Sequence, residues 1–330
     1  MNVRSFEQLH VNGIRLRSLV AGEGPLVILV HGWPQCWYLW RHMIDPLIDA
    51  GYRVAAPDMR GFGCSEAPPA VEDYAIRKLA GDVVGIAQAL GDERFVVVGH
   101  DWGCVVAWYT ALLHPRQCRA VMGLSVPFWR MGPETVDPTG NDDAFWYMRY
   151  FQEPGIAERE LERDVRASLA SIYYSVCGQA GQTTFLCQMA RPRSSGLLDA
   201  LPPPGDLSSF MSELDMDYYV AQYQHSGFRG SLNWYRNIPT LSASTPELDG
   251  MKISQPAAFL AGSEDPVLLF DPLWREHFVP CFEDLRFVEL IDGAGHWVQL
   301  EQPGETNAHV LRFLDGLELR PARASAGSQA

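Results

Sequence analysis

Short apolar runs alternate with longer amphipathic stretches over the first 130 residues of the chain. Residues 26–30 (LVILV) are continuously apolar, which predicts a strand buried on both faces. Residues 76–90 carry apolar side chains every three or four positions, which predicts an amphipathic helix, and Gly91 follows as its stop signal. Alternating segments on either side of Asn12-Gly13 predict an antiparallel hairpin. The remaining predictions in this part are strands within 52–58, 95–103 and 119–127, and helices near 38–50 and 105–114.

This succession of strands and helices predicts a mostly parallel sheet with helices on both faces. The alternation stops at about residue 131. From there to about residue 247 the sequence is rich in Pro, Tyr and Trp, with helical pieces and no convincing strand signal. Strands and helices resume with predicted strands in 257–265 and 285–296, a helix near 270–279 and a final helix over 303–317.

The expected organisation is therefore one α/β core interrupted by a helical insertion. We expect the core to comprise residues 1–130 and 248–318, and a helical cap to comprise residues 131–247. The cap segment is rich in aromatic and aliphatic residues, as expected for an apolar pocket entered from solvent. Residues 319–330 are polar, which predicts a flexible tail.

Composition narrows the class of protein without identifying it. The 330 residues are 47% hydrophobic and 20% charged, as expected for a globular protein. Lys and Arg number 26 against 40 Asp and Glu, and the formal net charge of −14 argues against a nucleic-acid partner. No apolar run approaches the ~20 residues of a membrane span, and no secretory signal pattern is present, so we predict a cytoplasmic protein. The seven scattered cysteines show no zinc-binding spacing and are expected to be reduced, so we predict no metal.

The sharpest chemical signal is the segment GHDWG at residues 99–103. Asp101 stands between a predicted strand and a predicted helix, and the flanking glycines allow a tight turn. Such a turn lifts its central side chain above the carboxyl ends of the strands, where open α/β sheets bind ligands. Most turns of this kind carry serine at the centre. Taken alone, Asp101 would be better explained as the N-cap of the following helix.

Two further residues favour catalysis over capping. Asp265 and His296 each lie in a loop directly after a predicted strand, so three reactive side chains are expected at one edge of the sheet. The chain order Asp101, Asp265, His296 corresponds to nucleophile, acid and base, the order found in α/β-hydrolases. Glu264 and Asp292 are alternative acids. Asp265 is favoured because it alone begins the loop straight after its strand.

The segment HGWP at residues 31–34 follows the buried strand of residues 26–30 and is a candidate for a further part of the catalytic site. We expect the backbone N–H of Trp33, together with that of Trp102, to form an oxyanion hole with two donors. A tight structural loop with a cis proline at Pro34 is the alternative, and both can hold at once.

Four segments, HGWPQCWYLWR, DMRGFGCS, GHDWG and GHWVQLEQP, resemble the soluble epoxide hydrolases of the α/β-hydrolase fold. The resemblance covers essentially the whole chain. Within the insertion, residues 146–158 and 227–237 resemble two cap segments of that family, each of which carries a functional tyrosine. The matching positions here are Tyr147 and Tyr235, with Tyr150 as the alternative if the register of the first segment slips.

The resemblance implies an enzyme that opens an epoxide to a vicinal diol. Asp101 would be the nucleophile that forms a covalent ester, and His296 the base that activates water. Asp265 would orient that base, and Tyr147 and Tyr235 would hydrogen-bond the epoxide oxygen. The implied partners are a small apolar epoxide and water, with no cofactor. The identity of the epoxide, the carbon attacked, a homodimer, and a role in detoxification, lipid signalling or biosynthesis all stay open.

Two alternatives use the same fold. A haloalkane dehalogenase shares the aspartate turn, but Trp33 in place of Asn and the tyrosine pair weigh against it. A non-catalytic ligand-binding homologue is disfavoured by the intact set of Asp101, Asp265 and His296. Assays of halide and diol would separate the first alternative, and ligand binding without turnover would mark the second.

Overall fold

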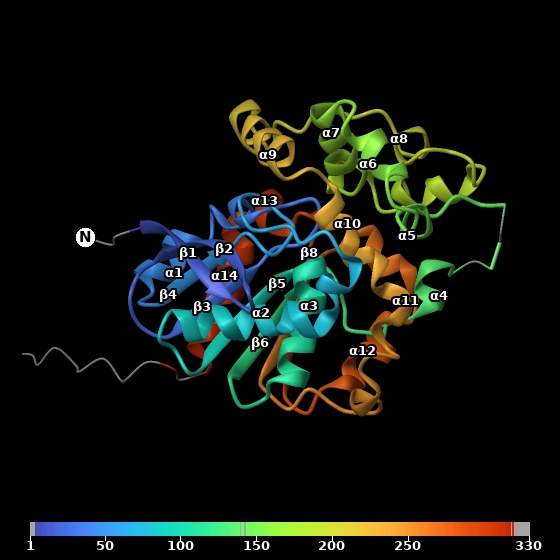
Figure 1. Ribbon diagram of the computed structural model, residues 1–330. Helices are drawn as coiled ribbons and strands as arrows, with labels where there is room; N and C mark the ends of the chain where they lie inside the picture. The colour runs from blue at the N-terminus through green and yellow to red at the C-terminus, as the bar shows by residue number, and fades with distance from the viewer. Residues whose placement is uncertain (1–3, 139, 142, 318, 320–330) are drawn as a thin grey trace, which may run out of the picture.

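The computed structural model describes residues 4–138, 140–141, 143–317 and 319. Within them, one eight-stranded sheet runs through the molecule in the order β1-β2-β4-β3-β5-β6-β7-β8 (Figure 1). The strands are β1 (Arg4–Val11), β2 (Ile14–Ala21), β3 (Leu26–Val30), β4 (Arg53–Pro57), β5 (Phe95–His100), β6 (Cys118–Leu124), β7 (Ala257–Gly262) and β8 (Leu285–Ile291).

The sheet is antiparallel at one edge and parallel elsewhere. Strands β1 and β2 form the predicted hairpin, whose turn residues Asn12 and Gly13 both have positive φ. Strand β2 also pairs antiparallel with β4, and the neighbours from β4 to β8 are all parallel. The continuous apolar run of β3 is fully buried between β4 and β5. The prediction of a mostly parallel sheet is confirmed.

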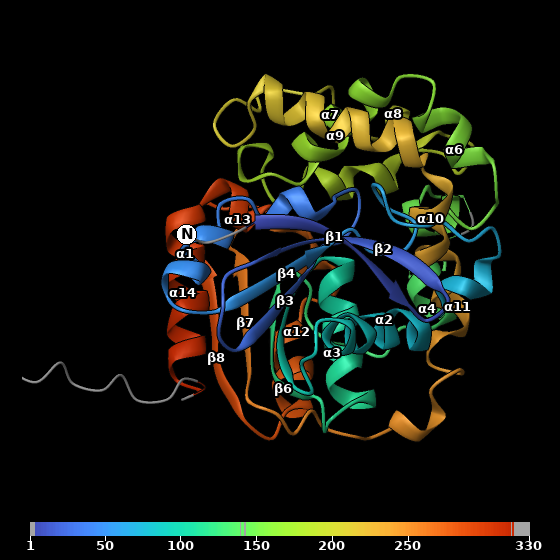
Figure 2. The same cartoon turned by 60° about the vertical axis from the view of Figure 1, so that its left-hand side comes forward.

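Helices cover both faces of the sheet, as predicted. On one side lie α1 (Ile44–Asp49) and α14 (Pro303–Asp315), and on the other lie α2 (Ile76–Ala89), α3 (Trp102–Leu113) and α12 (Trp274–Phe278) (Figure 2). The apolar stripe predicted within 76–90 is the buried face of α2. The fold is the α/β arrangement expected from the sequence.

Two predicted helices are shorter than the sequence pattern suggested. The stretch near 38–50 is divided into a 3₁₀ turn (Trp37–Trp40) and α1, and the stretch near 270–279 is divided in the same way. Proline explains the first division. Pro46 lacks the N–H that a continuous helix from residue 38 would need, whereas it fits the first turn of α1.

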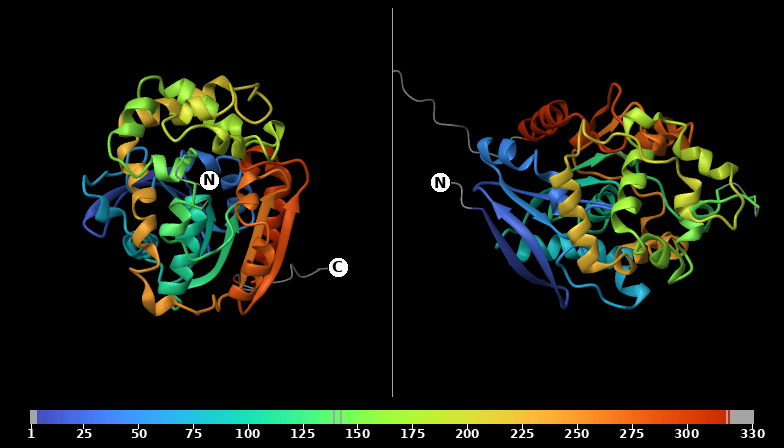
Figure 3. Two further views of the ribbon diagram at one scale, coloured as in Figure 1. Left: turned by 90° about the vertical axis from the view of Figure 1, so that its right-hand side faces the viewer. Right: turned by 90° about the horizontal axis from the view of Figure 1, so that it is seen from above.

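The described residues between 131 and 247 form helices and no strand. Helices α5 to α9 lie above the carboxyl ends of the core strands, while α10 and α11 descend along the core (Figures 1 and 3). The boundaries of the cap at residues 131 and 247 stay a prediction. Of the predicted tail, residues 319–330, only residue 319 is among the described residues. The cap helices are α4 (Pro133–Val136), α5 (Tyr147–Tyr150), α6 (Ile156–Leu161), α7 (Val165–Ser175), α8 (Leu197–Ala200), α9 (Glu213–Ser226), α10 (Arg229–Arg236) and α11 (Ile238–Leu241).

Two features bear on the predictions made from composition. No helix in the described part of the chain is long and apolar enough to cross a membrane. All seven cysteines are free thiols, and four of them are buried.

Candidate active site

Asp101 occupies a strained turn between β5 and α3. Its backbone has φ 55° and ψ −122°, a region that costs a non-glycine residue roughly 1–3 kcal/mol. The turn depends on close backbone approaches, because a Cβ at Gly99 would collide with the Gly103 carbonyl and one at Gly103 with the Val30 carbonyl. The Asp101 side chain makes no capping hydrogen bond to α3. Asp101 therefore stands at the N-cap position without capping the helix through its side chain, and its carboxylate is available for other contacts.

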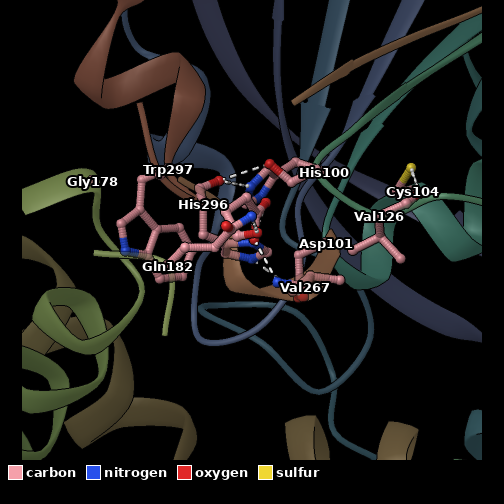
Figure 4. Close-up of polar contacts among 12 residues, drawn as sticks. His100, Asp101, Cys104, Val126, Gly178, Gln182, Val267, His296 and Trp297 are labelled. Atoms are coloured by element: carbon pink, nitrogen blue, oxygen red, sulfur yellow. Dashed lines mark hydrogen bonds and ion pairs between the residues drawn. The ribbon is translucent and has the colours of Figure 1, made fainter. Parts of the chain in front are cut away.

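The structure brings the three predicted side chains together. Nδ1 of His296 lies 3.0 Å from Oδ2 of Asp265, and Nε2 of the same ring lies 3.5 Å from Oδ2 of Asp101 (Figure 4). The other oxygen of Asp265 accepts a hydrogen bond from the Val267 N–H at 3.0 Å, which fixes the carboxylate. Asp265 is fully buried and His296 is 4% exposed. One imidazole is thus held between two carboxylates, away from bulk water.

The alternative acids occupy different surroundings. Asp292 is exposed, and Glu264 is only partly buried. Neither makes an ion pair with His296 within the described residues, whereas both oxygens of Asp265 lie within 3.2 Å of its Nδ1. Among the three candidates, Asp265 has the geometry to orient the ring.

The carboxylates of Asp101 and Asp265 raise the proton affinity of the His296 ring, which lies between them. Burial alone would lower the pKa of His296, but the Asp265 charge and the hydrogen bonds to both carboxylates outweigh it and raise the pKa to about 10. For Asp101, burial would raise the pKa, but the hydrogen bond and charge of His296 outweigh it and lower the pKa below its usual value. In the free protein the ring is therefore cationic and Asp101 anionic near neutral pH.

The loop after β3 and the start of α3 supply the two predicted backbone donors. The Trp33 N–H donates to Oδ1 of Asp101 at 2.6 Å, and a backbone hydrogen bond from Trp102 also favours the ionised Asp101. The Trp33–Pro34 peptide bond is cis, so the tight-loop alternative holds alongside the donor role. The two oxygens of Asp101 are consequently distinct, because Oδ1 accepts the Trp33 N–H and Oδ2 faces His296.

Two tyrosines reach the same site from separate cap helices. Tyr147 on α5 and Tyr235 on α10 have ring centroids 5.9 Å apart, and the Tyr235 ring lies 5.8 Å from Trp33 and 5.2 Å from Trp102. Burial, and then the nearby charge of Asp101, raise the pKa of both phenols well above its usual value. Both hydroxyls therefore stay protonated and able to donate.

Hydrogen bonds between cap helices fix this pair. Gln152 Nε2 donates to the Tyr235 carbonyl at 3.1 Å, and Arg236 Nε donates to the Phe151 carbonyl at 3.0 Å. Tyr150, the alternative to Tyr147, instead donates its hydroxyl to Glu160 at 2.8 Å. Tyr150 does not line the cavities beside Asp101, so the first register of the cap segment has the better geometry.

Two small cavities, of about 50 and 30 Å³, flank the Asp101 carboxylate. They share the walls Asp101, Tyr147, Tyr235, Val267 and Phe270. A groove of about 650 Å³ lies beyond the smaller cavity, and the residues common to these two spaces are Trp129, Met148, Val267 and Phe270. Its lining is mainly aromatic and aliphatic. A hollow of about 760 Å³ near Arg60 contains none of the candidate site residues.

Comparison with known proteins agrees with this geometry. The alpha/beta hydrolase fold family matches residues 25–303 of the chain. Epoxide hydrolase A of Mycobacterium tuberculosis is 44% identical over 314 residues, which are 94% of this chain and 97% of that protein. The chain belongs to the epoxide hydrolases of the α/β-hydrolase fold. The sequence resemblance to this family is confirmed.

Solved structures of the family show the same fold over nearly the whole chain. Epoxide hydrolase A from Mycobacterium thermoresistibile superposes with a TM-score of 0.89 at 41% identity, covering 96% of this chain and 100% of that one. Epoxide hydrolase I from potato (Solanum tuberosum) gives 0.84 at 30% identity, covering 95% and 100%. Because coverage is nearly complete in both, the helical insertion as well as the core is common to these epoxide hydrolases.

Three residues around His296 were not predicted from the sequence. His100 Nε2 lies 2.7 Å from the His296 carbonyl, and Ser125 Oγ donates to the same oxygen at 2.8 Å. Glu301 accepts from the N–H groups on either side of His296. His100 and Glu301 lie inside the segments that resemble the epoxide hydrolases, and that position was the only feature of the sequence that could have indicated a role near His296. Ser125 has no such feature, because its contact depends on the pairing of β6 with β7.

The described residues contain no group of three or more His, Cys, Asp or Glu side chains arranged to hold a metal ion. The arrangement beside Asp101 offers a buried carboxylate, a paired imidazole, two amide donors and two phenols.

Proposed function

We propose that this epoxide hydrolase opens its substrate in two steps, through a covalent ester on Asp101. The observation that carries the proposal is the asymmetric setting of the Asp101 carboxylate. Oδ1 accepts the Trp33 N–H at 2.6 Å, whereas Oδ2 faces His296 beside cavities that Tyr147 and Tyr235 line.

In the first step, Oδ2 of Asp101 attacks an epoxide carbon. A carbon–oxygen bond forms to Oδ2, the ring carbon–oxygen bond breaks, and its electron pair goes to the ring oxygen. Tyr147 and Tyr235 hydrogen-bond that oxygen and supply its proton as it becomes a hydroxyl. Their raised pKa values keep both phenols protonated until the alkoxide forms. The product of this step is a neutral ester of Asp101.

The ester changes the proton affinity of His296. Asp101 loses its charge when the ester forms, and with it one of the interactions that hold the pKa of His296 at about 10. Asp265 remains to orient the ring. The ring passes its proton to the tyrosinate that the first step leaves, which restores the phenol, and its neutral Nε2 can then accept a proton from a water molecule. The Asp101 charge thus keeps the base protonated before the first step, and its loss prepares the base for the second.

In the second step, the activated water attacks Cγ of Asp101. Negative charge develops on Oδ1, where the N–H groups of Trp33 and Trp102 stabilise it. The bond between Cγ and Oδ2 then breaks, and its electron pair goes to Oδ2, which takes the second proton of the attacking water. The diol leaves with Oδ2, and the carboxylate of Asp101, with one oxygen from water, and the protonated His296 are restored.

The walls of the site favour an uncharged apolar epoxide. Three titratable side chains that line the groove are already engaged, since His277 pairs with Asp271 at 2.6 Å and Arg130 donates to Thr245 and Ser242. The inner cavities, of about 50 and 30 Å³, accommodate few atoms. The bulk of a larger substrate would therefore lie toward the groove. The names of the relatives, all epoxide hydrolases, support an epoxide as the reacting group.

Variants of the two central residues test the proposal with styrene oxide and a long-chain terminal epoxide. We expect Asp101→Ala to abolish diol formation and His296→Gln to accumulate an ester, seen by intact-protein mass spectrometry as the added mass of the substrate. A single turnover of wild type in ¹⁸O-labelled water should place the label in Asp101 and not in the diol. Near-normal turnover by Asp101→Ala, or label in the diol of the first turnover, would overturn the proposal.

A haloalkane assay provides the matching control for the class of reaction. Trp33 and two tyrosines line the cavity beside Asp101. We therefore expect no halide release from 1-chlorobutane or 1-bromobutane under conditions that give rapid diol formation.

A further inference from the structure

The Glu301 carboxylate lies where the cap meets the loop that carries His296. Oε2 accepts the Gly295 N–H at 3.0 Å and the Gly178 N–H at 2.8 Å, and Oε1 accepts the Trp297 N–H at 3.0 Å. Two of these donors flank His296, and the third belongs to the chain just beyond cap helix α7. One side chain therefore joins the base loop to the cap.

The backbone of His296 is fixed on every side by partners from other segments. Its N–H donates to the Val176 carbonyl at 2.8 Å, and its carbonyl accepts from Ser125 Oγ at 2.8 Å. The carbonyl also lies 2.7 Å from His100 Nε2 (Figure 4). With Glu301 holding the neighbouring N–H groups, the orientation of the imidazole is set through the backbone, as well as through Asp265.

The end of α7 in the cap also packs closely against the loop that carries His296. A Cβ at Gly295 would collide with the Gly178 backbone nitrogen, and one at Gly178 would collide with the Gly293 carbonyl. The indole N–H of Trp297 donates to the Tyr173 carbonyl of α7 at 2.9 Å. Figure 4 shows Gly178 and Trp297 near His296. Backbone approaches this close leave no room for a side chain at Gly178 or Gly295, and they restrict movement of the His296 loop relative to the end of α7.

We propose that Glu301 is a positioning residue for ester hydrolysis, which acts by fixing the His296 loop against the end of α7. The inference rests on the proposed two-step function. Three N–H donors converge on Glu301, and a carboxylate has acceptor capacity on both oxygens, whereas an amide has only one acceptor oxygen. Because His296 acts in the second step, loss of Glu301 should affect ester hydrolysis and spare ester formation.

The test compares Glu301→Gln with Glu305→Gln, a nearby exposed glutamate on α14 that contacts none of these groups. Rapid-quench single-turnover experiments with styrene oxide give separate rate constants for ester formation and ester hydrolysis, normalised to the burst of active sites. For Glu301→Gln we expect hydrolysis to slow by about tenfold or more with formation within about twofold of wild type, so that the ester accumulates. For Glu305→Gln we expect both rate constants to match wild type.

A second variant keeps the test decisive if Glu301→Gln does not fold. Glu301→Asp retains the charge but is one methylene shorter, so its rate constant for ester hydrolysis should lie between those of Glu301→Gln and wild type. If Glu301→Gln does not fold, the expected result is a rate constant for Glu301→Asp below that of wild type. Hydrolysis at the wild-type rate, or an equal loss in both steps, would show a merely structural role and overturn the inference. Absence of any ester in wild type would instead contradict the proposed function.

Discussion

Nε2 of His296 lies 3.5 Å from Oδ2 of Asp101, so the proposed base and the proposed nucleophile stabilise each other's charged forms before substrate arrives. Asp265 holds the opposite nitrogen of the same ring at 3.0 Å. The cation between two anions is stable until one of the anions is consumed. In the proposed reaction the first step removes the charge of Asp101, because the carboxylate becomes an ester. His296 can therefore act as a base only after the ester has formed.

The pKa of His296 should fall when the Asp101 charge is removed. The two carboxylates raise it to about 10, and Asp101→Asn keeps the shape of the side chain while deleting one charge. Titration of the His296 ring by NMR should show a clearly lower pKa in Asp101→Asn than in wild type. A wild-type ring that titrates near the ordinary value of 6.5 would contradict this account.

The same shift makes folding stability depend on pH. The folded pKa of His296 lies above its unfolded value, so the stabilising contribution is fully present below about pH 6.5 and is lost as pH rises toward about 10. Urea unfolding between these pH values should show a declining free energy of unfolding in wild type. The decline should be smaller in Asp101→Asn.

The two cap tyrosines should act on ester formation. Tyr147→Phe and Tyr235→Phe each remove one hydroxyl beside Asp101, and we expect each to slow ester formation by roughly 10- to 100-fold. The double variant should nearly stop it. Tyr150→Phe, whose hydroxyl bonds Glu160 instead, is the matched control and should form the ester at a rate close to wild type. Unchanged ester formation in the double variant would remove the tyrosines from the mechanism.

The groove beyond the inner cavity should select for long apolar arms. Met189→Trp places a large ring in that groove, and we expect it to lower the ratio of kcat/KM for 1,2-epoxydodecane to that for 1,2-epoxybutane by about tenfold. Leu214→Trp, at a position 79% exposed on α9, is the control and should leave the ratio as in wild type. An unchanged ratio in Met189→Trp would place the long arm elsewhere.

A buried ion pair between the segment after β4 and helix α2 should contribute to folding rather than to chemistry. Arg60 donates to both oxygens of Asp82 at 2.6 and 2.7 Å, and both side chains are almost completely buried. Asp82→Ala leaves a buried guanidinium without its carboxylate, which should lower the free energy of unfolding by about 3–5 kcal/mol. Urea unfolding measures the loss, with the exposed Asp49→Ala as control. A loss no larger than the control's would mean that Arg60 finds other partners.

The core of the site could be predicted because its signals are local. Asp101, Asp265 and His296 each follow a strand whose apolar pattern is visible over a few residues, and parallel strands bring such loops to one edge. Tyr147 and Tyr235 lie in an insertion without a periodic pattern of that kind. Their prediction came from resemblance to the epoxide hydrolases alone.

The contacts of Glu301 could not be predicted, because they depend on how distant segments approach. Its partner Gly178 lies in the cap, 123 residues earlier in the chain, and nothing in the pattern around either residue indicates the other. The groove is a similar case, since its walls come from the end of β6, the cap and the loop after β7. Local periodicity predicts elements and the ends of strands, but not which insertions touch them.

The position of the insertion also sets the order in which a growing polypeptide acquires its reactive groups. Asp101 is synthesised before the whole cap, while Asp265 and His296 come after it. A ribosome-bound chain that ends within the cap therefore carries the Asp101 carboxylate without the His296 imidazole. Under the proposed mechanism, such a fragment could be alkylated by an epoxide at most once, and turnover would require a chain that has reached His296.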